Sequence, residues 1–197
     1  MLFRSEVISS GAFRTAAYDP ATGKELWRVS YPVAFPEGFS NVIAPLYGEG
    51  LIFLSAGFNT PSFFAVRAGG AGDVTKTHVA WTLERGAPLT SSPVLVGDAL
   101  YVVNDRGVAS CVDAKTGAVR WQQRLEGGYS ASPVAADGRV YFLNEEGLAT
   151  VLEPGRAFRL LATNRLDAVT LASIAVSNGS IFIRSATHLY RRSEEHT

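Results

Sequence analysis

The chain has 197 residues, and its 18 basic and 18 acidic residues leave a formal net charge of zero. This length allows one domain with a sizeable core, whereas the balanced charge gives no long-range field for a phosphate backbone, so we expect no nucleic-acid partner. The single cysteine, Cys111, excludes an intrachain disulfide, and no apolar run approaches the roughly 18 residues that span a bilayer, so we expect no transmembrane segment.

The first recognisable element is a strand, a turn and a second strand. The apolar run Ala16–Tyr18 is followed by Asp19, Thr22, Gly23 and Trp27. Asp and Thr side chains can hydrogen-bond the turn backbone, and glycine supplies a left-handed residue. We expect the large tryptophan ring to pack between neighbouring sheets, although a set of such rings could also stack on a ligand.

A second pattern recurs along the rest of the chain at spacings of 48, 40 and 41 residues. Its anchors are Pro45, Pro93, Pro133 and Ile174. Each anchor is followed eight residues later by an aromatic residue, namely Phe53, Tyr101, Tyr141 and Phe182. A turn pair stands between anchor and aromatic residue: Glu49-Gly50, Gly97-Asp98, Asp137-Gly138 and Asn178-Gly179. These pairs tolerate positive φ and predict tight hairpins.

The first pattern also returns, out of phase with the second. Asp113, Thr116, Gly117 and Trp121 repeat the offsets of the first turn. In the repeat between them Trp81 is kept, but the turn has grown into Ala68–Asp73, and this insertion explains the spacing of 48 residues. A self-similarity near 40 residues is typical of repeat folds.

Each repeat predicts four short strands, and the third repeat gives their places most clearly. They are Ser92–Val96, Leu100–Val103, Val108–Val112 and Ala118–Leu125. No stretch of the chain shows a sustained helical period. A repeat of about 40 residues with four strands predicts an all-β fold, a β-propeller of four-stranded blades.

The Asp, Thr, Gly and Trp pattern, with the starts Ser92-Pro93-Val94 and Ser132-Pro133-Val134, resembles the pyrroloquinoline-quinone (PQQ)-like repeat family. That family includes quinoprotein dehydrogenases and the non-catalytic outer-membrane assembly lipoprotein of the BamB type. The resemblance covers about residues 12–190. It implies an eight-bladed ring, of which about five partial or whole blades are visible, so we expect a half-ring.

The fourth and fifth repeats depart from the pattern. Glu153-Pro154-Gly155 replaces the Asp-to-Gly turn, no tryptophan follows it, and the fifth repeat stops near Tyr190. The last residues break the apolar pattern abruptly. We therefore expect a partial propeller domain over residues 1–190 and a tail that is not native to it over residues 191–197.

In a propeller of this strand order, the loops before each first strand and the turns between second and third strands open on one face. Loops on a rigid scaffold often carry function, so these residues form a candidate interaction face, unless they are ordinary solvated turns. They are Thr90, Ser91, Asn104, Asp105, Arg106, Tyr129, Ser130, Asn144, Glu145 and Thr170. No catalytic or metal-ligating residue is assigned.

The resemblance implies a non-catalytic interaction scaffold with a protein partner, in the periplasm or outside the cell. Met1–Glu6 lacks the apolar core of a signal peptide, so no localisation signal is visible. One alternative is a PQQ-dependent alcohol or sugar dehydrogenase with its catalytic residues in missing blades. The other is a small-ligand or carbohydrate sensor. The chain has no adjacent cysteine pair, so the balance is against an enzyme, and PQQ with calcium belongs only to the dehydrogenase alternative.

Overall fold

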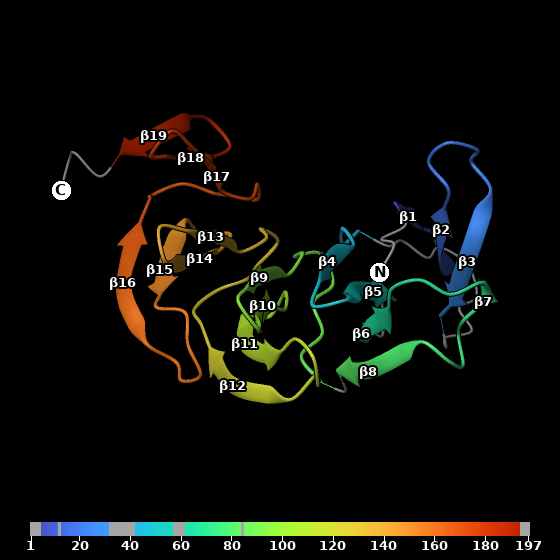
Figure 1. Ribbon diagram of the computed structural model, residues 1–197. Helices are drawn as coiled ribbons and strands as arrows, with labels where there is room; N and C mark the ends of the chain where they lie inside the picture. The colour runs from blue at the N-terminus through green and yellow to red at the C-terminus, as the bar shows by residue number, and fades with distance from the viewer. Residues whose placement is uncertain (1–4, 12, 32–41, 57–61, 84, 194–197) are drawn as a thin grey trace. The chain divides into compact units, whose positions relative to one another are not determined.

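The computed structural model of the chain describes residues 5–11, 13–31, 42–56, 62–83 and 85–193. Within these ranges the regular structure is entirely β (Figure 1), and no helix in them could cross a membrane. The strands form five sheets, four of four strands and one of three. The prediction of an all-β fold built from four-stranded sheets is thereby confirmed.

The chain divides into two compact units. The first comprises residues 1–89 together with residues 115–117, and the second comprises residues 90–114 and 118–197. The candidate interaction face lies entirely in the second unit, because its residues run from Thr90 to Thr170.

The first unit contains two sheets. One consists of β1 (Val7–Ser10), β2 (Arg14–Tyr18), β3 (Glu25–Ser30) and the short β7 (Gly72–Asp73), which is parallel to β3. The other consists of β4 (Leu46–Gly48), β5 (Leu51–Ala56), β6 (Ser62–Arg67) and β8 (Val79–Leu83). Buried apolar side chains from both sheets form one core, which includes Trp27, Val29, Ile52, Phe64 and Val66.

The turn between β2 and β3 has the chemistry that the sequence predicts. A carboxylate oxygen of Asp19 accepts hydrogen bonds from the backbone N–H groups of Ala21 (2.8 Å) and Thr22 (3.0 Å). Gly23 follows with a φ of 69°, in the left-handed region. The side chain of Asp19 thus replaces backbone partners that the turn itself lacks.

The second unit contains three antiparallel sheets. The first consists of β9 (Val94–Val96), β10 (Ala99–Val103), β11 (Val108–Asp113) and β12 (Val119–Arg124). The second consists of β13 (Val134–Ala136), β14 (Arg139–Leu143), β15 (Leu148–Leu152) and β16 (Leu160–Arg165). The third consists of β17 (Ala175–Ser177), β18 (Ser180–Arg184) and β19 (Leu189–Ser193).

The strands predicted for the third repeat are all present, with ends that differ by no more than two residues. Strand β19 continues to Ser193, past the domain boundary expected at residue 190. Residues 194–197 of the expected tail lie outside the described residues.

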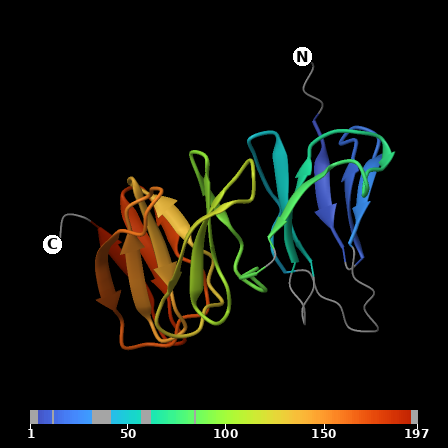
Figure 2. The ribbon, with the colours of Figure 1, turned by 90° about the horizontal axis from the view of Figure 1, so that it is seen from below.

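Side chains between consecutive sheets of the second unit fill two apolar clusters. Tyr101 and Cys111 of the first sheet pack with Val140 and Phe142 of the second. Leu143 and Ala149 of the second sheet pack with Ile183 of the third. Figure 2 shows the strands of these sheets running alongside one another at the C-terminal end of the chain. Each sheet is therefore stabilised by burial against its neighbour, as in other repeat folds.

The hairpins between first and second strands have the predicted two-residue turns. Asp137 and Gly138 have φ angles of 47° and 66°, and Asn178 and Gly179 have φ angles of 48° and 67°. Positive φ at both central residues is the type I′ geometry, which matches the twist of the flanking strands. Gly97 has a φ of 59°, so this hairpin also needs the freedom of glycine at its first turn position.

Candidate functional site

The candidate interaction face consists of turns and entry loops in the second unit. The turns connect β10 with β11 and β14 with β15, and the entry loops precede β9, β13 and β17. We call this assembly the turn platform and define it as residues 90–91, 104–107, 128–131, 144–147 and 167–171.

Asn144 organises the turn between β14 and β15. Its side-chain oxygen accepts hydrogen bonds from the backbone N–H groups of Glu146 (3.1 Å) and Leu148 (2.7 Å), and its amide nitrogen donates to the Glu126 carbonyl (3.0 Å). Gly147 closes the turn with a φ of 82°. The Asn144 side chain is buried, so its hydrogen bonds hold both the turn and the segment that leads into β13.

The same turn occurs one repeat earlier. The side-chain oxygen of Asn104 accepts from the backbone N–H groups of Arg106 (3.1 Å) and Val108 (2.9 Å), and Gly107 has a φ of 82°. Sequence reasoning assigned both asparagines to the candidate face but missed this recurring Asn-x-x-Gly turn. Its signal was the repetition of both residue types at a spacing of 40.

A carboxylate in each turn binds the entry loop of its own sheet. The Thr90 hydroxyl donates to a carboxylate oxygen of Asp105 at 2.6 Å. In the next repeat the Ser130 hydroxyl donates to the carboxylate of Glu145. A hydrogen bond to an ionised acceptor is stronger than one between neutral groups. Asp105 and Glu145 therefore help to fix the loops.

Each turn also binds the entry loop of the following sheet. The Tyr129 N–H donates to the Asp105 carbonyl at 3.1 Å, and the Thr170 N–H donates to the Glu145 carbonyl at 3.0 Å. The Thr170 hydroxyl donates to the Asn144 carbonyl at 2.6 Å. These bonds join consecutive sheets of the second unit, so the platform is a continuous hydrogen-bonded network.

Serines at one repeat position extend this network. The Ser92 N–H donates to the hydroxyl of Ser132 at 2.9 Å, and the Ser132 N–H donates to the hydroxyl of Ser173 at 2.9 Å. The three serines stand at the same place, just before the first strand of their sheets. Through these serines, the entry loops before β9 and β13 each donate a backbone hydrogen bond to the entry loop of the following sheet.

The structure buries part of the face that the sequence predicts. Ser91, Tyr129, Asn144 and Thr170 are fully buried, and burial raises the pKa of Tyr129 to about 12. Of these four side chains, Asn144 and Thr170 hydrogen-bond the platform from within. Thr90, Asn104, Asp105, Ser130 and Glu145 are half-buried, and Arg106 is exposed.

The exposed apolar side chains of the platform lie on both sides of Thr170. Val169 is 57% exposed and Leu171 is 60% exposed. Glu146 and Asp167 are also exposed. In the sequence this pattern is visible as the order apolar, polar, apolar at residues 169–171, of which only Thr170 is buried.

Trp81 and Trp121 lie on the fourth strands of their sheets, β8 and β12, and Trp27 lies on β3. Trp27 is fully buried, whereas Trp81 and Trp121 are half-buried. The ring of Trp121 lies 6.0 Å from that of Tyr101 and 5.3 Å from that of Phe158, measured between centroids. Its indole N–H donates to the Gly155 carbonyl at 3.3 Å.

A bulge accompanies each of these tryptophans. The register between the strand that carries each tryptophan and the preceding strand of its sheet shifts next to the pairs Ala17–Trp27, Ala65–Trp81 and Cys111–Trp121. The same shift occurs in the fourth repeat, where Ala162 stands in place of tryptophan. A bulge re-aims the side chains around it, so the backbone of the repeat is kept where the ring is lost.

Near Trp121 the repeat carries a charge cluster instead of a ligand site. A guanidinium nitrogen of Arg120 lies 2.6 Å from a carboxylate oxygen of Asp98 and 2.7 Å from one of Asp113. The bond to Arg120 lowers the pKa of the Asp98 carboxyl. The thiol of Cys111 is buried in the strand next to Asp113, and this burial raises its pKa. A buried thiol of raised pKa is a packing group and a poor nucleophile.

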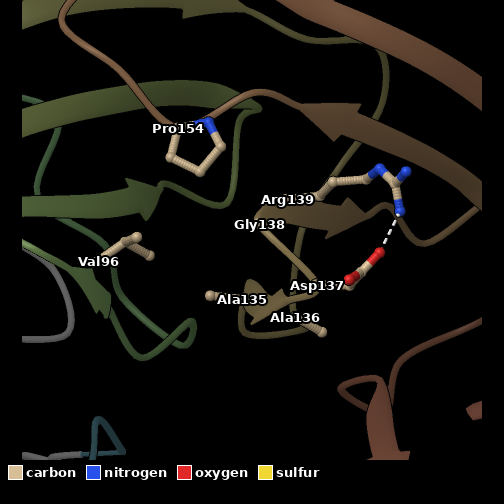
Figure 3. A pocket seen from close by; sticks show the side chains of 7 residues that line it. All are labelled: Val96, Ala135, Ala136, Asp137, Gly138, Arg139 and Pro154. Carbon is tan, nitrogen blue, oxygen red and sulfur yellow. Dashed lines mark hydrogen bonds and ion pairs between the residues drawn. The ribbon is translucent and has the colours of Figure 1, made fainter. Parts of the chain in front are cut away.

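A shallow hollow of about 200 Å³ lies beside the hairpin between β13 and β14 (Figure 3). Its lining is mostly small and apolar, from Val96, Ala135, Ala136 and Pro154. The two charged groups at its rim, Arg139 and Asp137, form an ion pair at 2.7 Å. The hollow therefore presents no free charge for a ligand.

The alternative with PQQ and calcium concerns the oxygen-bearing side chains of the described residues. Calcium takes six to eight oxygen ligands, and the described residues contain no group of three His, Cys, Asp or Glu side chains that could hold a metal ion. Asp105 and Glu145 each accept a hydroxyl donor of their own sheet.

Comparisons with known proteins identify the family. A family model described as outer membrane protein assembly factor BamB matches residues 12–171. The structure of BamB from Moraxella catarrhalis shares 16% identity with a TM-score of 0.73, covering 95% of this chain and 54% of that chain. No curated protein sequence shows significant similarity. The chain thus spans about half the length of that BamB structure.

Two further structures share the fold. The Cps50 (Swd1) β-propeller domain of Myceliophteria thermophila has 11% identity and a TM-score of 0.68, over 97% of this chain and 67% of that one. The computationally designed Ika8 protein has 10% identity and a TM-score of 0.74, over 97% of this chain and 56% of that one. At such identities the likeness concerns the fold. The match over residues 12–171 and the repeated four-stranded sheets together show that this chain belongs to the BamB-like family of PQQ-type β-propeller repeats.

Proposed function

We propose that this chain is part of a non-catalytic β-propeller scaffold that binds a protein partner outside the cytoplasm, in the assembly of outer-membrane proteins. The observation that carries the proposal is the turn platform, in which hydrogen bonds fix the loops of consecutive sheets while Val169 and Leu171 stay exposed. A preorganised surface loses little conformational entropy on binding, so more of its contact energy becomes affinity.

The family supplies the biological setting of this proposal. Its description names an assembly factor for outer-membrane proteins, and such a factor acts through contacts with other proteins. Under the proposal, the periplasm is the compartment and a protein is the partner. The whole protein is proposed to be a ring of eight four-stranded sheets, because neighbours in a ring cover the faces and strand edges that an open array exposes.

The scaffold is tested by Leu171→Asp in the full-length protein, expressed in its own host in place of the wild type. A charge on this exposed side chain is expected to lower the amount of folded outer-membrane proteins several-fold, because it disrupts an apolar contact at the platform. Outer-membrane fractions quantified by gel and mass spectrometry measure the effect.

Leu160→Asp is the matched control. Leu160 is 51% exposed on β16, outside the platform, and its replacement is expected to leave the outer-membrane proteins unchanged. Circular dichroism of both purified variants establishes that they remain folded. The scaffold proposal fails if Leu171→Asp, while folded, supports wild-type levels of outer-membrane proteins.

The dehydrogenase alternative gives a separate prediction for the full-length protein. Oxidation of an alcohol by a quinone cofactor requires a bound metal and residues that orient the cofactor. We expect the purified protein, supplied with PQQ and calcium, to reduce no artificial electron acceptor with alcohols or aldose sugars. Absorbance of the dye measures the reaction. Dye reduction that depends on PQQ, calcium and substrate together would support the dehydrogenase alternative and reject the non-catalytic scaffold.

A further inference from the structure

The hairpin between β17 and β18 turns on the dipeptide Asn178-Gly179. Ser177 and Ser180 pair across its base, so the dipeptide forms the whole loop. Asn178 is exposed, and its φ of 48° is followed by a φ of 67° at Gly179. No other Asn-Gly pair occurs in the chain. Asn178 is therefore the only asparagine of the chain that is followed by a residue without a side chain.

The side chain of Asn178 is not held in place. Among the described residues it has no hydrogen-bond partner, and the Gly179 N–H donates to no described group. By contrast, the side-chain oxygens of Asn104 and Asn144 each accept two backbone hydrogen bonds. The amide of Asn178 can therefore turn toward the backbone that follows it.

The hairpin one repeat earlier shows which side chains this turn accepts. Asp137 and Gly138 have φ angles of 47° and 66°, close to those of Asn178 and Gly179. Aspartate thus fits the first turn position. The Asp137 carboxylate pairs with Arg139 at 2.7 Å (Figure 3), and an ionised carboxylate is a poor electrophile. The neutral amide at the same position in the later hairpin lacks this protection.

We propose that Asn178 is a site of spontaneous deamidation. The Gly179 backbone nitrogen attacks Cγ of Asn178 and forms a C–N bond. The side-chain nitrogen takes up the proton that the Gly179 nitrogen loses, and it leaves as ammonia. The product is a five-membered succinimide ring. Water then adds to one of the two ring carbonyl carbons and opens the ring to aspartate or to isoaspartate, in which the main chain runs through the side-chain carboxyl group.

Ring closure requires a local change of the backbone, and this hairpin allows it. The Gly179 nitrogen has to approach Cγ of Asn178, so the type I′ turn has to open. Strand β17 lies at the edge of its sheet, and its three residues are all exposed. Local opening of such an edge costs little free energy. A Cβ added at Gly179 would meet nothing within 4 Å, so no neighbouring group blocks the tip of the hairpin.

The two products affect the hairpin differently. Aspartate keeps the length of the main chain, and Asp137 shows that this turn accommodates it. Isoaspartate adds a methylene carbon to the main chain, so a turn of two residues no longer matches its strands. The pairing of Ser177 with Ser180 is then expected to loosen. Both products add a negative charge at the tip.

Peptide mapping by mass spectrometry tests this inference on the full-length protein, incubated in mildly alkaline buffer. The tryptic peptide of residues 166–184 is expected to gain the mass difference between OH and NH₂. It should elute as two products, of which a protein isoaspartate methyltransferase labels one. The rate in the folded protein is expected to lie within about tenfold of the rate in a synthetic peptide of the same sequence, because the hairpin opens easily.

Variants locate the reaction at this turn. Gly179→Ala is expected to slow it at least about tenfold, because the added methyl group shields the attacking nitrogen. Asn178→Gln is expected to slow it at least as much, because its ring would have six members. Gly138→Ala makes the same change in the earlier hairpin and is the matched control, with an unchanged rate at Asn178. Circular dichroism establishes that each variant is folded.

The inference is overturned if Asn178 stays intact in the folded protein while the synthetic peptide converts. It also fails if Asn104 or Asn144 converts as fast as Asn178, or if Gly179→Ala converts as fast as Gly138→Ala. Hydrogen exchange of the peptide of residues 166–184 measures the consequence. Exchange is expected to be faster in the incubated wild type than in freshly purified Asn178→Asp, and equal exchange would overturn the loosening of the hairpin by isoaspartate.

Discussion

Replacing Trp121 by Ala in the full-length protein is expected to lower the free energy of unfolding by about 3 kcal/mol. The change removes the ring that packs on Tyr101 and Phe158, together with the hydrogen bond to the Gly155 carbonyl. Truncation of a large aromatic residue in a core costs about 3–5 kcal/mol. The lower end applies because Trp121 is half-buried.

Val119→Ala is the control on the same strand, and its cost is expected to stay below about 0.5 kcal/mol because Val119 is 44% exposed. Urea unfolding followed by circular dichroism measures both variants without relying on tryptophan fluorescence. Partner binding by Trp121→Ala should fall only as far as the folded fraction falls. An unchanged midpoint with lost binding would instead place Trp121 in a binding site.

The elements that the sequence predicted correctly depend on local chemistry. The hairpin at Asp137 and Gly138 could be predicted because these residue types tolerate positive φ, and the structure gives them φ angles of 47° and 66°. The repeat spacing then predicted the positions of the four strands of each repeat. Such features need no knowledge of the rest of the fold, because a turn and its two strands are close in the sequence.

The environment of each tryptophan could not be predicted from its motif. Trp27 and Trp121 have the same offset from their turns, yet Trp27 is fully buried and Trp121 is half-buried. The difference depends on tertiary neighbours such as Phe158, which follows Trp121 by 37 residues and packs edge-to-face on it. A motif fixes the position of a side chain in its strand, whereas the neighbouring sheet fixes its burial.

The sequence predicted which loops form the candidate face, but not which side chains of these loops are buried and which are exposed. Asn144 and Thr170 are polar loop residues, which are usually solvated, but they bond each other's segments across 26 residues of sequence and are buried. Val169 and Leu171 are apolar, yet they are exposed, and Thr170 between them takes the inward position. Which of two alternating sets points inward depends on partners that only the fold brings together.

Replacing Gly147 by Ala is expected to lower the free energy of unfolding by about 3 kcal/mol. Gly147 has a φ of 82°, where an L-residue is strained by about 1–2 kcal/mol. An added Cβ would also lie 2.6 Å from the carbonyl oxygen of Ala168 and closer still to that of Leu166. Both contacts are with backbone atoms, which cannot rotate away as a side chain can. The segment 166–168, which follows β16, therefore has to move.

Two other glycines of the second unit serve as controls for this prediction. They separate the cost of backbone strain from the cost of a close contact with the added Cβ. Gly138 has a φ of 66° and nothing within 4 Å of an added Cβ, so Gly138→Ala reports the strain alone, about 1 kcal/mol. Gly155 has neither a positive φ nor a close neighbour, and Gly155→Ala is expected to change stability by less than about 0.5 kcal/mol. Urea midpoints of the three full-length variants measure the order.

The effect of Gly147→Ala is also expected to reach the platform. The Leu166 N–H donates to the Gly147 carbonyl at 2.9 Å. The segment that begins at Leu166 leads within five residues to Leu171. A shift of this segment moves Val169 and Leu171 out of their place in the platform. Binding of the protein partner should therefore fall in the fraction of Gly147→Ala that is still folded, while Gly138→Ala binds normally. Equal stability of these two variants would show that the backbone around Gly147 yields without cost, and the turn would not control the position of the loop.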